Sequence, residues 1–260
     1  MTVARAVEHP SASAILAKAQ HENFPVALRI LPRTLRGRLE TIYGFARLVD
    51  DLGDEWDGDR NAALDWLEAE LERAFEGRAE HPLLQRITVF VRETGVTREP
   101  FQRLIEANRQ DQVVSRYATW DELAHYCTLS ANPVGELVLA SIGAATPERI
   151  RQSDDVCTAL QLVEHLQDVA EDEARGRFYI PAEDLERFGM TPALTKFEVE
   201  RARTLLASGV PLVASLRGAG KLAVAAFVGG GRAAANALER GDRFAGKPER
   251  LLETWRVFRG

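Results

Sequence analysis

The chain has few of the residues and runs that mark secreted or membrane-spanning proteins. Only two cysteines, Cys127 and Cys157, occur in 260 residues, and they form no C-x-x-C motif. Free buried thiols in a reducing compartment are therefore the expected state. There is no apolar run of about 18 residues and no signal-peptide stretch near Met1. We expect a cytoplasmic protein, either soluble or attached peripherally to the inner face of the membrane.

Excess positive charge and phosphate-binding loops are also missing. The net charge of −6 argues against nucleic acid as the main partner. The one glycine cluster, Gly229-Gly230-Gly231, is placed between predicted helices rather than after a strand. Neither a Rossmann fingerprint nor a Walker loop is therefore present, and NADPH binding has no support. The five histidines form no zinc-type pair, and we interpret His165 as a packing residue.

What the sequence does contain is apolar residues at helical spacing along most of its length. No segment sustains the alternation of a strand. The predicted helices begin near Ser11 or Ser13 and then cover 34–54, 61–77, 82–91, 98–117, 121–145, 153–173, 195–217, 218–240 and the tail from 248. Pro133 predicts either a kinked helix lining a cavity or tight helix packing, and Pro181 predicts a loop. The pattern indicates an all-α fold in a single domain, residues 1–260.

A first acidic stripe lies near the end of the helix predicted at 34–54. Tyr43, Arg47, Asp50 and Asp54 fall at i, i+4, i+7 and i+11, which places them on one helical face. Unpaired, the carboxylates would repel one another, whereas Mg²⁺ prefers such oxygen ligands together with water and substrate phosphates.

A second stripe follows in the helix predicted at 153–173. Gln161, Glu164, Asp168 and Asp172 fall at i, i+3, i+7 and i+11. Either stripe alone is more often a solvated face. Apolar residues interleave with both stripes, however, so both helices are expected to be largely buried. The two stripes together therefore predict a magnesium site between two helices.

Three motifs in order resemble the squalene/phytoene synthase family. They are Phe45-Ala46-Arg47 running into Asp50-Asp51-x-x-Asp54, the block from Tyr126 to Gly135, and Gln161 to Asp172 followed by Gly176-Arg177-x-Tyr179-x-Pro181. Short strings such as Glu22 to Ala27, Ser130 to Gly135 and Leu166 to Val169 are most similar to the bacterial hydroxysqualene synthase branch of hopanoid biosynthesis. The resemblance implies a single-domain, isoprenoid-synthase-like helical bundle around a central apolar cavity.

The resemblance also implies roles for individual residues. Asp50, Asp54, Asp168 and Asp172 would bind Mg²⁺, with Asp51 in support. Tyr43, Arg47 and Arg177 would contact a prenyl diphosphate, and Phe24, Tyr126 and Gln161 would contact the cavity or the substrate. Tyr126 and the four principal aspartates would be the catalytic set. Glu164 stands where the family commonly has Asn, and we expect it to serve as a metal ligand in that place.

Three functions remain open at this point. The first is conversion of presqualene diphosphate to hydroxysqualene, with water capturing the rearranged cation. The second is head-to-head joining of two prenyl diphosphates, such as farnesyl diphosphate, into presqualene diphosphate or phytoene. The third is a non-catalytic helical relative that binds or assembles partners, although intact acids in both stripes favour an enzyme. The sequence leaves substrate chain length and oligomeric state open.

Overall fold

The computed structural model describes residues 10–18 and 30–260. Its described elements, in chain order, are α1 (Ala12–Lys18), α3 (Arg33–Asp50), the π-helical η1 (Asp51–Glu55), α4 (Arg60–Glu76), α5 (Pro82–Thr94), α6 (Glu99–Gln110), α7 (Trp120–Ser130), α8 (Asn132–Ser141), α9 (Pro147–Gln167), α10 (Val169–Ala174), α11 (Ala182–Phe188), α12 (Pro192–Leu206), α13 (Gly209–Ser215), α14 (Gly218–Glu239) and α15 (Lys247–Arg259). No strand occurs in this part of the chain. The predicted all-α class is confirmed.

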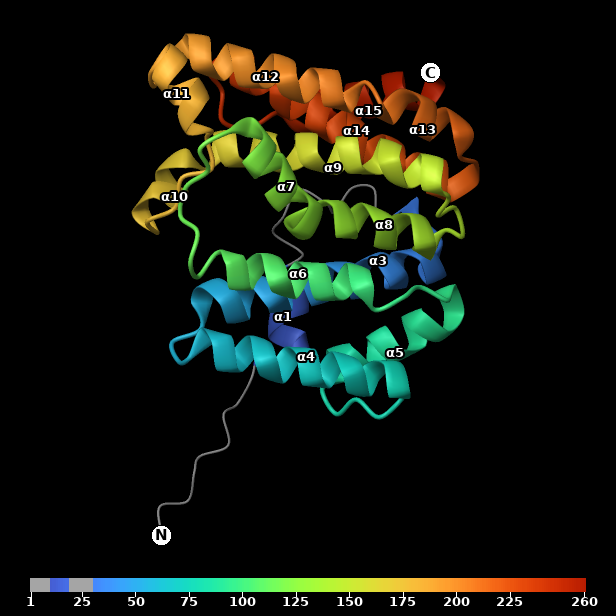
Figure 1. Cartoon of the computed structure of the whole chain (residues 1–260). Helices are drawn as coiled ribbons and strands as arrows, with labels where there is room; N and C mark the ends of the chain where they lie inside the picture. The colour runs from blue at the N-terminus through green and yellow to red at the C-terminus, as the bar shows by residue number, and fades with distance from the viewer. Residues whose placement is uncertain (1–9, 19–29) are drawn as a thin grey trace.

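The helices form two groups joined by α7 and α8 (Figure 1). One group contains α3 to α6, and the other contains α9 and α12 to α15. Helix α9 packs against α7 and α8 on one side and against α12, α13 and α14 on the other. The bundle is thus built around α9, which also carries Gln161 and Glu164, the first two residues of the second acidic stripe.

Helix ends follow local sequence signals. The side chains of Asp59, Thr119 and Thr146 cap α4, α7 and α9 by accepting hydrogen bonds from backbone N–H groups in the first turn. Gly77 and Gly95 end α4 and α5 with positive φ, which a glycine adopts without strain. Ser11 accepts a hydrogen bond from the Ala14 amide at the start of α1, so one of the two predicted first caps is confirmed.

Several predicted boundaries were wrong. The helix predicted at 121–145 divides at Ala131 into α7 and α8, because Pro133 begins a new helix more readily than it continues one. The helix predicted at 195–217 divides after Leu206. Pro181 was expected to start a loop but is the N-cap of α11, whose first turn carries Glu183 and Asp184.

The glycine cluster lies inside α14 and not between helices. A Cβ atom at Gly229 would stand 2.4 Å from the Thr254 backbone nitrogen, and one at Gly231 would stand 2.6 Å from a Leu160 methyl. These contacts show that α14 packs its backbone directly against α15 and closely against α9. The glycines are therefore packing residues of a helix.

The helix predicted at 98–117 ends early, and the chain beyond it becomes extended. Arg116 and Phe178 form an isolated parallel bridge, the Phe178 amide donates to the Ser115 carbonyl at 2.8 Å, and the Ala182 amide donates to the Tyr117 carbonyl at 3.0 Å. This pairing holds the segment after α10 against the segment after α6. It thereby fixes the position of residues 177–179 beside the acidic stripes.

Both cysteines are free, with Cys127 buried and Cys157 half-buried. Among the described helices, none combines the length and the apolar character needed to cross a bilayer.

Candidate active site

The first acidic stripe lies at the junction of α3 and η1. The α-helix gives way to one π-helical turn at Asp51, so Asp54 is not at the straight-helix position that the spacing predicted. Gly53 makes this turn possible, since a Cβ atom there would stand 2.0 Å from the Asn108 side-chain oxygen. Gln112 supports the turn by donating to the Gly53 carbonyl at 3.0 Å.

Asp50 is accessible to water but lies deep among protein atoms. Its Oδ1 accepts a long hydrogen bond of 3.4 Å from the Asn108 amide on α6. Desolvation raises the pKa of Asp50 to about 7, with further contributions from the neighbouring charges of Asp54 and Asp51. An acid in this environment is stabilised in its charged form by any added cation.

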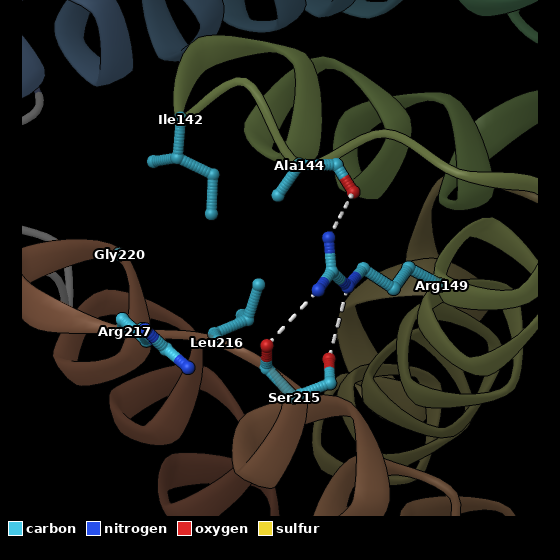
Figure 2. Close-up of a pocket in the computed structure, with 7 residues that line it drawn as sticks. All are labelled: Ile142, Ala144, Arg149, Ser215, Leu216, Arg217 and Gly220. Atoms are coloured by element: carbon cyan, nitrogen blue, oxygen red, sulfur yellow. Dashed lines mark hydrogen bonds between the residues drawn. The ribbon is translucent and has the colours of Figure 1, made fainter.

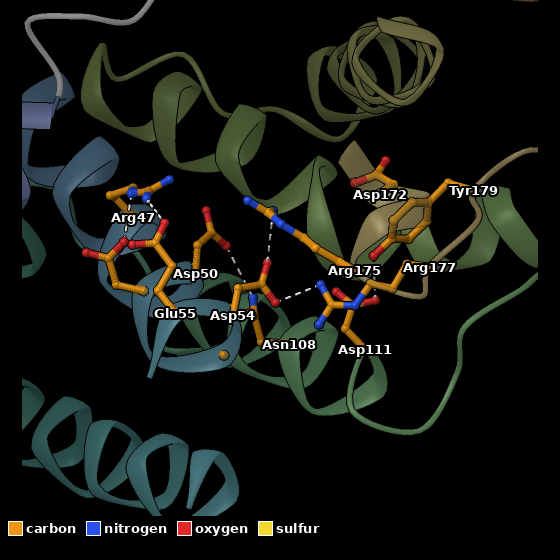
Figure 3. A network of polar contacts seen from close by, with 12 residues as sticks. Arg47, Asp50, Asp54, Glu55, Asn108, Asp111, Asp172, Arg175, Arg177 and Tyr179 are labelled. Atoms are coloured by element: carbon orange, nitrogen blue, oxygen red, sulfur yellow. Dashed lines mark hydrogen bonds and ion pairs between the residues drawn. The ribbon is translucent and has the colours of Figure 1, made fainter. Parts of the chain in front are cut away.

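Asp54 faces two arginines from the segment after α10 (Figure 3). Arg177 Nη1 lies 2.7 Å from Asp54 Oδ1, and Arg175 Nη1 lies 4.0 Å from Oδ2. Burial disfavours the charge on Arg177, yet Tyr179, Asp54 and Asp111 raise its pKa above the usual value. The site thus holds a permanently charged guanidinium beside a carboxylate.

Asp111, just after α6, joins two tyrosines. The Tyr126 hydroxyl donates to Asp111 Oδ2 at 2.6 Å, and the Tyr179 hydroxyl donates to Oδ1 at 3.0 Å. Desolvation raises the pKa of Asp111 to about 6, while both tyrosine bonds and Arg177 act in the opposite direction. The predicted contact residue Tyr126 therefore belongs to an aromatic group with Tyr117 and Tyr179, whose ring centroids lie 5.3–6.1 Å apart.

The second acidic stripe does not lie on one continuous helix as predicted. Helix α9 ends at Gln167, Asp168 has φ −111° and ψ 14°, and α10 begins at Val169. Asp168 Oδ1 lies 2.7 Å from Arg243 Nη2, and Arg243 also pairs with Glu171 at 2.6 Å. Spacing alone could not reveal the break, because no glycine or proline marks it.

Two other members of the second stripe, Gln161 and Asp172, lie beside His165. Asp172 Oδ2 lies 3.8 Å from His165 Nδ1, and Gln161 Nε2 lies 3.3 Å from His165 Nε2. The imidazole stacks on the Tyr179 ring with centroids 4.0 Å apart and an interplanar angle of 9°. Desolvation lowers the pKa of His165, which favours the neutral ring. His165 is thus a buried residue that packs beside the second stripe, as expected.

The other predicted site residues lie on the same two helices or outside the described chain. Arg47 Nε lies 2.8 Å from Asp51 Oδ1, and its Nη2 donates to Glu55. Tyr43 is half-buried on α3, and Glu164 is exposed on α9. Phe24 lies outside the described residues.

The donor set suits a hard cation. Within the described ranges no three His, Cys, Asp or Glu side chains are grouped closely enough to enclose one ion. Mg²⁺ usually takes only one or two carboxylates and completes its shell with water and substrate phosphates. The Asp50 and Asp54 carboxylates, with the raised pKa of Asp50, fit such an open site. Asp168 and Asp172 offer the same donor chemistry on the facing segment.

Sequence reasoning missed Asn108, Asp111, Arg175 and Arg243 as site residues. They occur singly in or after helices, without a repeated spacing that would set them apart. Only their contacts with Asp50, Asp54, Tyr126, Tyr179 and Asp168 identify them.

A cavity of about 480 Å³ lies near the first turn of α9, whereas the acids lie at the end of that helix. Figure 2 shows the residues that line the cavity. The cavity opens between the α8–α9 and α13–α14 turns, beside Ile142, Leu216 and Arg217. Arg149 closes one wall by donating to Ser215 and to the Ala144 carbonyl. Helix α9 has 21 residues and spans roughly 30 Å, so this cavity is separate from the acidic site.

Comparison with known proteins agrees with this arrangement. The squalene/phytoene synthase family model matches residues 17–256. A hydroxysqualene synthase of Rhodopseudomonas palustris is 36% identical over 213 residues, which cover 75% of this chain and 72% of that protein. A phytoene synthase of Arthrospira platensis is 30% identical over 220 residues, or 73% of this chain and 71% of that protein.

A solved structure supports the same assignment. The crystal structure of squalene synthase HpnC from Alicyclobacillus acidocaldarius superposes with a TM-score of 0.82 at 40% identity, covering 90% of this chain and 95% of that chain. The chain is an enzyme that belongs to the squalene/phytoene synthase family. This family acts on prenyl diphosphates.

Proposed function

We propose that the chain converts presqualene diphosphate to hydroxysqualene in a Mg²⁺-dependent reaction. The observation that carries this proposal is the meeting of Asp54 with Arg177, because it brings the two acidic segments together around a cationic group. The similarity to a hydroxysqualene synthase supports this branch of the family. Asp50, Asp54, Asp168 and Asp172 would hold Mg²⁺, with Asp51 in support and Glu164 as a further oxygen ligand.

In this proposal the arginines of the site would bind the diphosphate. Arg177 is only 12% exposed and remains cationic, and Arg175 stands beside it on the same segment. Both now face Asp54. A diphosphate bound beside Asp54 would be contacted by both arginines. Mg²⁺ would supply additional positive charge to this leaving group. Loss of diphosphate from carbon then leaves an allylic or cyclopropylcarbinyl cation.

In this proposal the aromatic side chains would control that cation. Tyr126 and Tyr179 are held through Asp111, and His165 lies flat against Tyr179. Aromatic faces attract cations, and fixed rings exclude stray water. In our proposal a single water adds to the rearranged cation and then loses a proton to give the alcohol.

Head-to-head condensation is the second candidate, and the similarity to a phytoene synthase favours it. The two functions differ in what meets the cation, which is water in the first and a second prenyl group in the second. Purified protein with Mg²⁺ and presqualene diphosphate should give hydroxysqualene, unchanged by NADPH. In ¹⁸O-labelled water the alcohol should carry the label. Two results would contradict the first function. One is squalene formed only with NADPH, and the other is condensation of farnesyl diphosphate without any turnover of presqualene diphosphate.

A further inference from the structure

Helix α15 presents an apolar face that no other described element covers. Leu251, Leu252 and Trp255 are 55%, 49% and 55% exposed, and Phe244, just before the helix, is 55% exposed. Eight large hydrophobic side chains in the described chain are exposed to this degree, and these four fall within one short segment. Residues 251, 252 and 255 share one side of a helix. We call these four residues the α15 face.

The opposite side of α15 is fixed to the protein. Val257 is buried, and the close approach of Thr254 to Gly229 brings the backbones of α15 and α14 together. The α15 face is therefore held outward by a rigid support and is not the exposed side of a loosely attached tail.

Positive charge surrounds the α15 face. The chain carries a net −6, but residues 240–260 contain six Lys or Arg and only three Asp or Glu. All three acids are engaged, Glu249 and Asp242 by Arg240 and the buried Glu253 by Arg256, while Arg243 pairs with two acids outside this segment. The segment as a whole keeps an excess of basic residues, and Lys247 and Arg259 are both exposed on it.

Cations also lie over the aromatic rings of this segment. The Arg259 guanidinium is 5.6 Å from the Trp255 ring centre, and that of Arg243 is 4.9 Å from the Phe244 ring centre. Tryptophan, leucine and phenylalanine beside Arg and Lys are typical of helices that lie in a bilayer interface, where apolar groups enter the lipid and cations meet anionic headgroups.

We propose that the α15 face docks the enzyme on an anionic lipid bilayer. A second copy of the chain is a poorer occupant, because a symmetric contact would bring two basic rims together. The docked orientation would also place the active site near the lipid surface, since Arg243 beside Phe244 pairs with Asp168 and Glu171. The proposal stands independently of which reaction the enzyme catalyses.

Sedimentation with vesicles tests the proposal on the full chain. Vesicles of phosphatidylcholine mixed with phosphatidylglycerol should bind the protein at least about tenfold more tightly than phosphatidylcholine alone, and high salt should weaken the binding. Leu252→Ser with Trp255→Ser should reduce binding to the mixed vesicles by at least about tenfold. The matched control is Val89→Ser with Met190→Ser, which removes two side chains that are 54% and 61% exposed elsewhere.

Circular dichroism should show the same melting temperature for both double variants within a few degrees, because all four side chains are largely exposed. Equal loss of vesicle binding in the two variants would overturn the proposal, as would absence of wild-type binding to the mixed vesicles. A wild-type dimer that the α15 variant dissociates, without any vesicle binding, would assign the face to a second copy instead.

Discussion

Arg177 Nη1 lies 2.7 Å from Asp54 Oδ1, and this ion pair connects the segment after α10 to the π-helical turn after α3. The two residues are far apart in sequence. Their contact depends on the extended pairing of residues 115–117 with 178–182, which fixes Arg177 opposite η1. The acidic site is therefore a product of the tertiary fold rather than of either helix alone.

We expect both acidic segments to be required for turnover. Asp50→Ala and Asp168→Ala should each lower kcat by at least about a hundredfold, because each removes a carboxylate that would hold the metal against the diphosphate. Circular dichroism should remain that of the wild type. Glu173→Ala is the control, since Glu173 is exposed on α10 beside Asp172. Near-normal activity of either aspartate variant in Mg²⁺ would show that the two-segment site is wrong.

Glu164 tests whether a carboxylate can replace an amide as a metal ligand. Glu164→Asn should remain active, because an amide oxygen can occupy the same position, but it should require more Mg²⁺ for half-maximal rate since one negative charge is lost. The measurement is rate against Mg²⁺ concentration. Complete inactivity with the fold retained would mean that Glu164 has another role.

Asp111 should act by positioning the two tyrosines. In Asp111→Asn one tyrosine hydroxyl loses its acceptor, so we expect unfolding free energy to fall by about 1–3 kcal/mol and kcat to fall by roughly tenfold. Tyr179→Phe removes one of the two hydrogen bonds and keeps the ring that stacks on His165. It should cost only about 0.5–1.5 kcal/mol. Urea unfolding and steady-state kinetics measure both variants. Equal losses of unfolding free energy and of kcat in the two variants would contradict the positioning role of Asp111.

The sequence allowed the fold class and most of the acidic residues to be predicted, because helical spacing and carboxylate chemistry are local properties. It did not predict the break at Asp168 or the π-helical turn at Asp51. Both depend on distant partners, namely Arg243 for Asp168 and Asn108 for the turn at Gly53. Asp111 escaped notice for the same reason, since its two tyrosine partners come from α7 and from the segment after α10.

Glu198 on α12 should make the protein less stable as pH rises. This buried carboxyl shares Arg201 with Asp184, and desolvation raises its pKa above the ordinary value, with the nearby charge of Asp184 acting in the same direction. The folded state therefore binds more protons than the unfolded state above the ordinary Glu pKa of about 4.3. The stability that this group contributes is fully present below that pH and is lost as pH rises through the raised pKa.

Glu198→Gln should remove this pH dependence, because glutamine still accepts from Arg201 and can donate to Asp184. Its unfolding free energy should exceed that of the wild type at alkaline pH and approach it at acid pH. Glu200→Gln, an exposed neighbour that pairs with Arg203, is the control and should leave the slope unchanged. Urea unfolding across pH measures all three proteins. An unchanged slope in Glu198→Gln would contradict the prediction.

The glycine cluster of α14 offers two adjacent substitutions with opposite expected effects. In Gly229→Ala the new methyl group would meet the Thr254 backbone at 2.4 Å, so α15 must shift, and we expect a loss of about 1–3 kcal/mol. Gly230→Ala meets no atom within 4 Å and should gain up to about 1 kcal/mol, because alanine favours the helix. Thermal and urea unfolding measure both changes. If both variants were equally stable, the direct backbone contact between α14 and α15 would be excluded, and with it the rigid support inferred for the α15 face.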